Sequence, residues 1–231
     1  MQPLILLSGL LSDETIWSDV AQRVGAFAAV NILAFPNMDS IEAMAEHVLQ
    51  NAPPAFALAG HSMGGRVSLE VVRRAPERVR GLGLFNTGIH PRRDSETESR
   101  GRLVELAREK GMAALAAEWL PPMMGASAQR RTEVMPRLIS MVERATPQSF
   151  AAQTKALLNR PDGATALSAV HVPTLLASGT ADTWSPIKQH EAMRQRIAGA
   201  DLVAIDNAGH MAPIEQPDAV AAAITIWMRR L

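Results

Sequence analysis

The sequence predicts an α/β fold: a mostly parallel, twisted sheet of about six strands, with helices on both faces and a helical cap inserted into it. Two observations lead to this fold class. Short apolar runs alternate with amphipathic helical patterns along most of the chain, and repeated strand–helix–strand units form parallel sheets with right-handed crossovers. The alternation stops between Gly88 and Ala169, where helical patterns follow one another without a strand.

The predicted strands are short, apolar in character and not alternating, as expected for strands that are covered on both faces. They are Leu4–Leu7, Ala29–Leu33, Ala55–Ala59, Leu82–Phe85, Thr174–Ala177 and Leu202–Ile205. The predicted helices between them are Glu14–Arg23, Ile41–Gln50, Gly65–Ala75, Ile187–Ile197 and Ala219–Arg230. The pairs Asp39-Ser40 and Pro217-Asp218 precede two of these helices and are typical of helix starts.

The interruption of the alternation predicts two domains. Residues 1–87 and 166–231 form the core, and residues 88–165 form the inserted helical cap. The cap region is rich in arginine and glutamate, and its clearest amphipathic helices are Thr132–Arg144 and Pro147–Leu158. An alternative stays open, in which this region extends one side of the core.

Composition excludes several classes of function. Lys+Arg and Asp+Glu are both 23, so the zero net charge does not favour nucleic acid or an anionic membrane as a partner. The absence of cysteine excludes a disulfide framework and a thiol nucleophile. The apolar run Pro3–Leu11 lacks the flanks of a signal peptide, and no run is long enough to span a bilayer, so we expect a cytoplasmic protein.

The most informative motif is Gly60-His61-Ser62-Met63-Gly64. A buried strand pattern precedes it and a helical pattern follows it, so the serine lies on a strand-to-helix turn. Such a turn lifts the hydroxyl above the sheet edge and aims the first helical amides at the same place. The motif therefore predicts that Ser62 is a nucleophile, with an ordinary glycine-rich turn as the alternative.

A serine hydroxyl attacks poorly unless a base removes its proton, and His210 is the best-placed base. It follows the last predicted strand, and the carboxyl ends of parallel strands share one edge of the sheet, so His210 and Ser62 should meet there. His47 and His190 fall in amphipathic helices and are expected at the surface. His61 is expected to pack against the sheet.

Asp182 is the predicted partner of the base. It follows the fifth predicted strand and lies between the serine and the histidine in chain order. A turn or helix-cap role is the alternative for an aspartate at this position. Asp206 is too close to His210 in sequence to reach its far nitrogen, and the end of the fourth strand carries Asn86-Thr87 instead of an acid.

Two backbone amides are predicted to form an oxyanion hole, the pocket that binds the negative oxygen of an acyl-transfer intermediate. Met63 supplies one amide because it follows the nucleophile at the start of a helix. The loop after the first strand supplies the other, with Leu10 as the first choice and Leu11 as the second.

With these residues in place, the chain resembles the α/β-hydrolase superfamily over its whole length. The motifs that carry the resemblance are Ser-Gly-Leu-Leu (8–11), Gly-His-Ser-Met-Gly-Gly (60–65), Gly-Thr-Ala-Asp (179–182) and Gly-His-Met-Ala-Pro-Ile-Glu-Gln-Pro (209–217). The resemblance implies Ser62 as nucleophile, His210 as general base and Asp182 as its orienting acid. The sequence departs in starting at what would be the third strand of the full fold and in having Ser8 where a histidine is common.

The function expected from these residues is hydrolysis of a small, mostly apolar carboxylic ester through an acyl-enzyme, without a metal or a cofactor. Lactones and thioesters are alternative substrates of the same triad. The candidate pocket residues are Leu10, Leu11, Met63, Trp119, Met123, Met124, Trp184 and Met211, and His90 is placed to touch substrate.

Two rival functions remain. One is a lyase that resembles the menaquinone-pathway enzyme and uses the triad to remove a proton. Its substrate carboxylate would require clustered arginines, so the orientation of Arg66, Arg92 and Arg93 discriminates between the two enzymes. The other rival is a ligand receptor of the same fold with very slow turnover.

Overall fold

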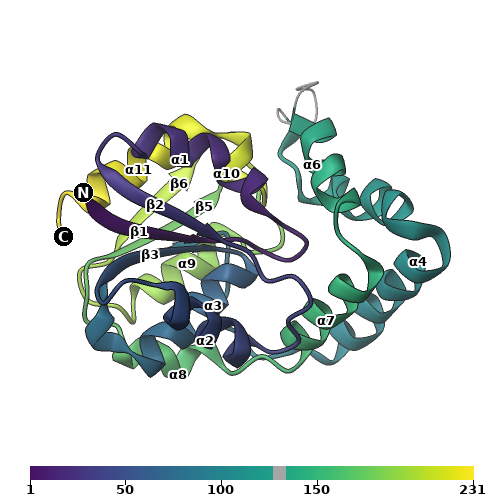
Figure 1. The fold of residues 1–231 in the computed structure, drawn as a ribbon, viewed down its shortest axis with the longest axis horizontal. Helices are drawn as coiled ribbons and strands as arrows, with labels where there is room; N and C mark the ends of the chain where they lie inside the picture. The colour runs from purple at the N-terminus through teal and green to yellow at the C-terminus, as the bar shows by residue number, and fades with distance from the viewer. Residues whose placement is uncertain (127–133) are drawn as a thin grey trace.

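The computed structural model describes residues 1–126 and 134–231 and contains a six-stranded sheet with the strand order β2-β1-β3-β4-β5-β6 (Figure 1). Its strands are β1 (Gln2–Leu7), β2 (Ala28–Leu33), β3 (Phe56–His61), β4 (Val79–Phe85), β5 (Thr174–Gly179) and β6 (Asp201–Ile205). All neighbouring strands pair in parallel. The predicted fold class is confirmed, and each predicted strand is present with ends that differ by a few residues.

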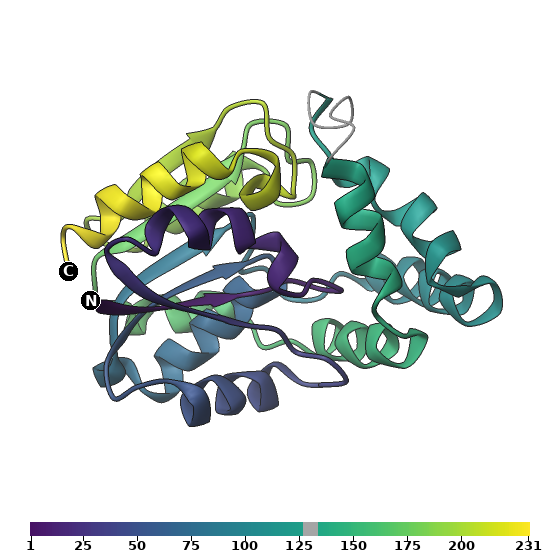
Figure 2. The ribbon, with the colours of Figure 1, turned by 45° about the horizontal axis from the view of Figure 1, so that its top comes forward.

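Helices cover both faces of the sheet. The helices of the core are α1 (Ser18–Val24), α2 (Ile41–Asn51), α3 (Met63–Arg74), α8 (Gly163–Ala166), α9 (Ile187–Arg194), α10 (Ala212–Glu215) and α11 (Pro217–Met228). Helices α1 and α11 pack against each other on one face, and α2, α3 and α8 lie on the other (Figures 1 and 2). Because both faces are covered, every residue of β3 and β5 is buried, which explains why these two strands are mostly apolar and do not alternate with polar residues.

Two fully buried tryptophans tie the covering helices to the sheet. Trp17, at the start of α1, donates its indole N–H to the carbonyl of Leu7 at 3.0 Å. Trp227 in α11 donates to the carbonyl of Pro173, also at 3.0 Å. Each indole thus buries a large apolar ring while its polar N–H is satisfied. The first contact fixes the end of β1, from which the predicted oxyanion loop departs.

The segment between β4 and β5 is mainly helical in the described part of the chain. Its larger helices, called the insertion helices below, are α4 (Asp94–Trp119), α6 (Val134–Glu143) and α7 (Pro147–Leu158). They form a group beside the ends of the strands (Figures 1 and 2). The prediction for Pro147–Leu158 is confirmed, whereas the start of the predicted helix Thr132–Arg144 lies outside the described residues.

Helix α4 was not predicted as one element. Gly111 interrupts it with a φ of 82° and a ψ of 174°, so the two halves meet at a kink. Because the kink changes the direction of the second half, the apolar positions of the two halves do not form one continuous stripe. The sequence pattern therefore does not indicate a single helix. Within the described residues, no helix combines the length and the apolarity that a bilayer crossing requires.

Candidate active site

Ser62 lies on a strained turn between β3 and α3. Its φ of 53° and ψ of −114° are unusual for a residue with a side chain, and such strain costs on the order of 1–3 kcal/mol. A Cβ atom on Gly60 would lie 2.3 Å from the carbonyl oxygen of Gly64, and one on Gly64 would lie 2.5 Å from that of Leu7. Only glycine fits at either position. The Ser62 amide donates to the carbonyl of Phe85 at 2.9 Å, which holds the turn against β4.

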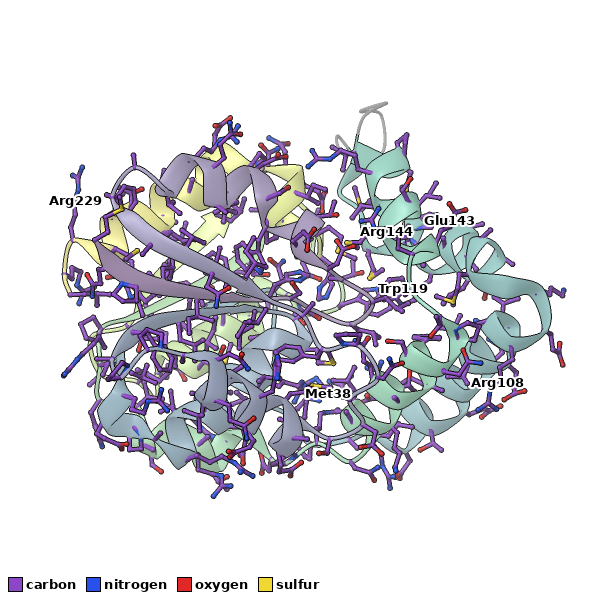
Figure 3. The ribbon with its side chains drawn as sticks, in the orientation of Figure 1. Met38, Arg108, Trp119, Glu143, Arg144 and Arg229 are labelled. Atoms are coloured by element: carbon purple, nitrogen blue, oxygen red, sulfur yellow. The ribbon has the colours of Figure 1, made fainter. Side chains whose placement is uncertain are left out.

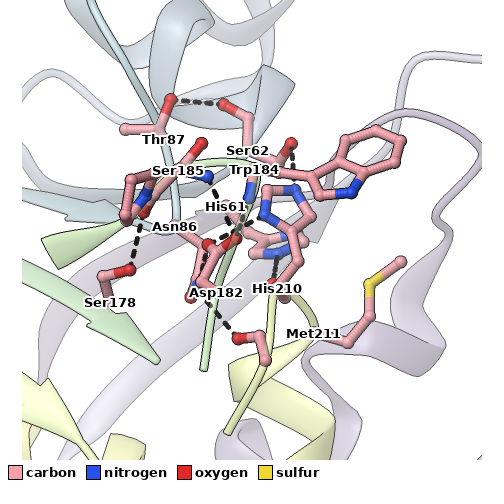
Figure 4. A network of polar contacts seen from close by, with 12 residues as sticks. His61, Ser62, Asn86, Thr87, Ser178, Asp182, Trp184, Ser185, His210 and Met211 are labelled. Carbon is pink, nitrogen blue, oxygen red and sulfur yellow. Dashed lines mark hydrogen bonds and ion pairs between the residues drawn. The ribbon is translucent and has the colours of Figure 1, made fainter. Parts of the chain in front are cut away.

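The structure brings Ser62, His210 and Asp182 together at the carboxyl edge of the sheet (Figure 4). The Oγ of Ser62 lies 2.9 Å from Nε2 of His210, and Nδ1 of the same ring lies 2.9 Å from Oδ2 of Asp182. With the aspartate ionised, Nδ1 carries the proton and Nε2 is free to accept the serine proton.

Asp182 is held in its ionised form. Burial by itself opposes the charge, but His210, the Asn86 amide and the backbone amide of Ser185 outweigh it and hold the pKa of Asp182 well below its usual range. The Asn86 Nδ2 donates to Oδ2 at 2.8 Å, and the amides of Trp184 and Ser185 donate to Oδ1 at 2.8 and 3.0 Å. Asn86, which stands at the end of β4 where an acid was considered, is thus a hydrogen-bond partner of Asp182.

Glu215 anchors the loop that carries His210. This carboxylate is fully buried in α10 and accepts from the amides of Gly209 and Met211, each at 3.0 Å. It also accepts from the amide of Gly125 at 2.8 Å, and the His210 amide donates to the carbonyl of Met123 at 2.6 Å. Met123 and Gly125, shortly after α4, are therefore fastened by hydrogen bonds to the loop that carries His210.

Two buried histidines, His61 and His190, form hydrogen bonds with the backbone near the triad residues. Burial, with His210 nearby, lowers the pKa of His61 to about 3, so the neutral ring donates from Nε2 to the carbonyl of His210 at 2.8 Å. His190 was predicted at the surface, which is wrong: it is fully buried, and burial lowers its pKa to about 4. Its Nε2 accepts from the amide of Thr87 at 3.3 Å, so the face of α9 that carries it points inward.

The predicted oxyanion loop is braced by an insertion helix. Gln153 in α7 is buried, and its Oε1 accepts from the amide of Leu11 at 2.9 Å while its Nε2 donates to the carbonyl of Phe35 at 2.9 Å. Leu11 adopts a left-handed φ of 54° in this loop. The Leu11 amide is therefore engaged, and Leu10 keeps an amide for which the described residues provide no acceptor.

A cavity of about 410 Å³ opens above Ser62 and His210. Of the predicted pocket residues, those that line it are Leu10, Met63, Trp119, Met123, Trp184 and Met211. Trp119 lies on the side of the insertion that faces the sheet (Figure 3), and the Trp184 ring lies 5.7 Å from the His210 ring. Leu11 lines a different cavity, and Met124 packs in the core, so neither is a wall of this one.

The same cavity also has charged walls, of which the sequence indicated only a part. Arg66 and Arg93 line it, as does His90, whereas Arg92 is exposed and does not. Two further arginines, Arg100 and Arg160, line it as well. Their positions depend on how the insertion packs against the core, which no local pattern reveals.

Comparisons with known proteins bear on the fold and the family of this chain. A model of the Alpha/beta hydrolase family matches residues 4–223. The chain is 25% identical over 242 residues to the pimeloyl-[acyl-carrier protein] methyl ester esterase of Aromatoleum aromaticum, covering 96% of each chain. A thermophilic esterase from Thermogutta terrifontis, with malate bound, superimposes with a TM-score of 0.88 at 30% identity, over 99% of this chain and 90% of that one.

The enol-lactonase from Burkholderia xenovorans superimposes with a TM-score of 0.89 at 23% identity, over 99% of this chain and 92% of that one, and shares the fold. The family match spans far more than half of the chain and includes the turn of Ser62 and the loop of His210. The protein belongs to the alpha/beta hydrolase family.

Proposed function

We propose that this protein is a serine esterase that hydrolyses a carboxylic ester through an acyl-enzyme at Ser62. The observation that carries the proposal is the pair of 2.9 Å contacts that link Ser62 to His210 and His210 to Asp182 beside a cavity. Similarity to esterases from two other organisms supports the same reaction class. We also propose that residues 88–165 act as a cap, since Trp119 and Met123 close one side of that cavity.

In the acylation step, Nε2 of His210 takes the proton of Ser62 as Oγ bonds to the ester carbonyl carbon. The carbonyl electron pair moves onto oxygen. When the tetrahedral intermediate collapses, the bond to the alcohol oxygen breaks and His210 returns its proton to that oxygen. A water molecule then repeats the sequence on the acyl-enzyme, releasing the acid and the Ser62 hydroxyl.

The Met63 and Leu10 amides are proposed to bind the oxyanion. Met63 is the first residue of α3, where the backbone amide has no partner within the helix. Leu10 lines the cavity, and its neighbour Leu11 already donates to Gln153, which leaves Leu10 as the better donor. Each such donor contributes roughly 2.7–4 kcal/mol to acyl transfer in other enzymes.

Gln153→Ala tests the bracing of this loop. The substitution leaves the Leu11 amide and the Phe35 carbonyl without their partner, so the Leu10 amide loses its fixed position. We expect kcat to fall about tenfold while KM changes little, because the oxyanion forms only after binding. Gln148→Ala, at an exposed position of the same helix, is the matched control. An unchanged kcat in Gln153→Ala would show that the brace is dispensable.

Steady-state hydrolysis of p-nitrophenyl esters of increasing acyl length tests the proposed function. We expect a kcat in the enzymatic range of about 1–10³ s⁻¹ on at least one ester, and turnover below about one per minute on all of them would favour a receptor. When one acyl group is carried on two different leaving groups, added methanol should divert the same fraction of product to methyl ester from both esters, because one acyl-enzyme precedes both products. A fraction that varies with the leaving group would contradict a common acyl-enzyme.

One observation favours a second candidate, the lyase that starts by removing a proton. Its substrate carboxylate needs arginines in the cavity, and Arg66 and Arg93 line the cavity. A lyase forms no acyl-enzyme, so the methanol experiment separates the two reactions.

A further inference from the structure

The cavity above Ser62 has one strongly basic end. The charged residues that line it there are Arg66, Arg93, Glu96, Arg100 and Arg160. Four guanidinium groups therefore face a single carboxylate. His90 does not add to the positive charge, because burial, together with the neighbouring arginines, lowers its pKa.

The one carboxylate is shared by two of the arginines. The guanidinium of Arg160 binds Glu96 through two nitrogens, at 2.6 and 2.9 Å, and Nε of Arg100 lies 3.2 Å from the same group. These partners outweigh burial and lower the pKa of Glu96 to about 2, so it stays charged. Arg160 also donates to the carbonyls of His90, Pro91 and Leu157, which engages its whole guanidinium in the structure of the insertion.

Arg66 has no such partner. Among the described residues, its guanidinium makes one hydrogen bond, from Nη1 to the carbonyl of His90 at 3.1 Å, and Nε of Arg160 donates to that same oxygen at 3.3 Å. Two cations thus meet at one neutral acceptor. No carboxylate of the described residues forms an ion pair with Arg66. Burial and the nearby Arg160 outweigh the attraction of Glu96 and Asp162 and lower the pKa of Arg66 to about 9, as expected for a partly buried cation that forms no ion pair with the described residues.

We infer that the Arg66 end of the cavity binds a free carboxylate of the substrate, so that the preferred esters carry a carboxylate away from the ester group. This inference rests on the proposed function. A guanidinium has five N–H donors, and those of Arg66 that face the cavity can hold a carboxylate by charge-assisted hydrogen bonds. An anion there also offsets the repulsion between Arg66 and Arg160.

The cavity walls between Arg66 and Ser62 indicate what lies between the carboxylate and the ester of the substrate. Trp119, Met123 and Leu157 are apolar and line the same cavity as Arg66 and Ser62. A short hydrocarbon chain between the carboxylate and the ester would contact them. A half-ester of a linear dicarboxylic acid has this arrangement. The mostly apolar ester expected from the sequence accounts for these walls but not for the arginines.

The test compares two methyl esters that differ mainly in the terminal carboxylate, monomethyl adipate and methyl hexanoate, by the rate of methanol release. In the wild type we expect kcat/KM to be at least about tenfold higher for monomethyl adipate, the effect of about one charge-assisted hydrogen bond. Arg66→Gln should remove this preference through a higher KM, and Arg66→Lys should restore part of it. Arg92→Gln, at an exposed position outside the cavity, is the matched control.

Methyl hexanoate also reports on folding, because its hydrolysis needs the triad but not Arg66. If Arg66→Gln lowers kcat/KM for both esters equally, or if the wild type does not prefer monomethyl adipate, the inference is overturned while the proposed function stands. If instead the protein hydrolyses neither ester, the carboxylate site can still be tested by calorimetric titration of Ser62→Ala with monomethyl adipate. Binding that is lost in the Ser62→Ala, Arg66→Gln double variant supports the carboxylate site even when no ester is turned over.

Discussion

Ser62→Ala is expected to lower ester kcat/KM by about 10⁴–10⁶-fold, the largest effect of any single substitution in this chain. In the proposed mechanism the Oγ atom of Ser62 bonds to the substrate carbonyl carbon, and the chain has no cysteine to replace it. The remaining activity would come from the oxyanion amides, which still polarise the ester for attack by water. The measurement is p-nitrophenyl ester hydrolysis at saturating and limiting substrate.

The turn around Ser62 should keep its shape in this variant, because the Ser62 amide and carbonyl, rather than its side chain, bind Phe85 and Thr87. We therefore expect an unchanged Tm. Ser99→Ala, at an exposed position of α4, is the control and should retain full activity. Activity of Ser62→Ala within about tenfold of the wild type would mean that another group is the nucleophile.

Asp182→Asn is expected to lower kcat by about 10⁴-fold, the second largest effect. The asparagine keeps the size of the side chain but can present an N–H to Nδ1 of His210, which then carries no proton. The proton moves to Nε2, and the ring can no longer accept from Ser62, 2.9 Å away. The defect is therefore in the chemical step, and KM should change little.

Asp206→Asn provides the matched control for this prediction. Asp206 follows β6 close to His210 in sequence, but it is exposed and has no contact with the histidine ring among the described residues. We expect its kcat to equal that of the wild type. A large loss in Asp206→Asn with a small loss in Asp182→Asn would reverse the assignment of the acid.

The sheet could be predicted because its strands have a distinctive sequence pattern of short apolar runs. Runs such as Leu4–Leu7 and Ala55–Ala59 are apolar at every position, a pattern that is typical of a strand buried on both faces. The parallel arrangement then places the ends of β3, β5 and β6 at one edge, which is why Ser62, Asp182 and His210 could be named before they were seen together.

Other parts of the site depend on tertiary packing and left no local signal. His190 lies in a short helix of mixed polarity, and the pattern did not show that its face turns inward. The brace from Gln153 to Leu11 joins residues 142 positions apart. The basic end of the cavity draws Arg66 from α3, Arg100 from α4 and Arg160 from the segment after α7, and an arginine in sequence looks the same whether it faces solvent or a pocket.

Labelling with a fluorophosphonate measures whether His210 and Asp182 make the Ser62 hydroxyl reactive. Mass spectrometry of the digested wild type should find one phosphonyl group, on the peptide that contains Ser62, and Ser62→Ala should take up none. Asp182→Asn should react far more slowly than the wild type. A wild-type protein that stays unlabelled, or a label on another residue, would contradict the account.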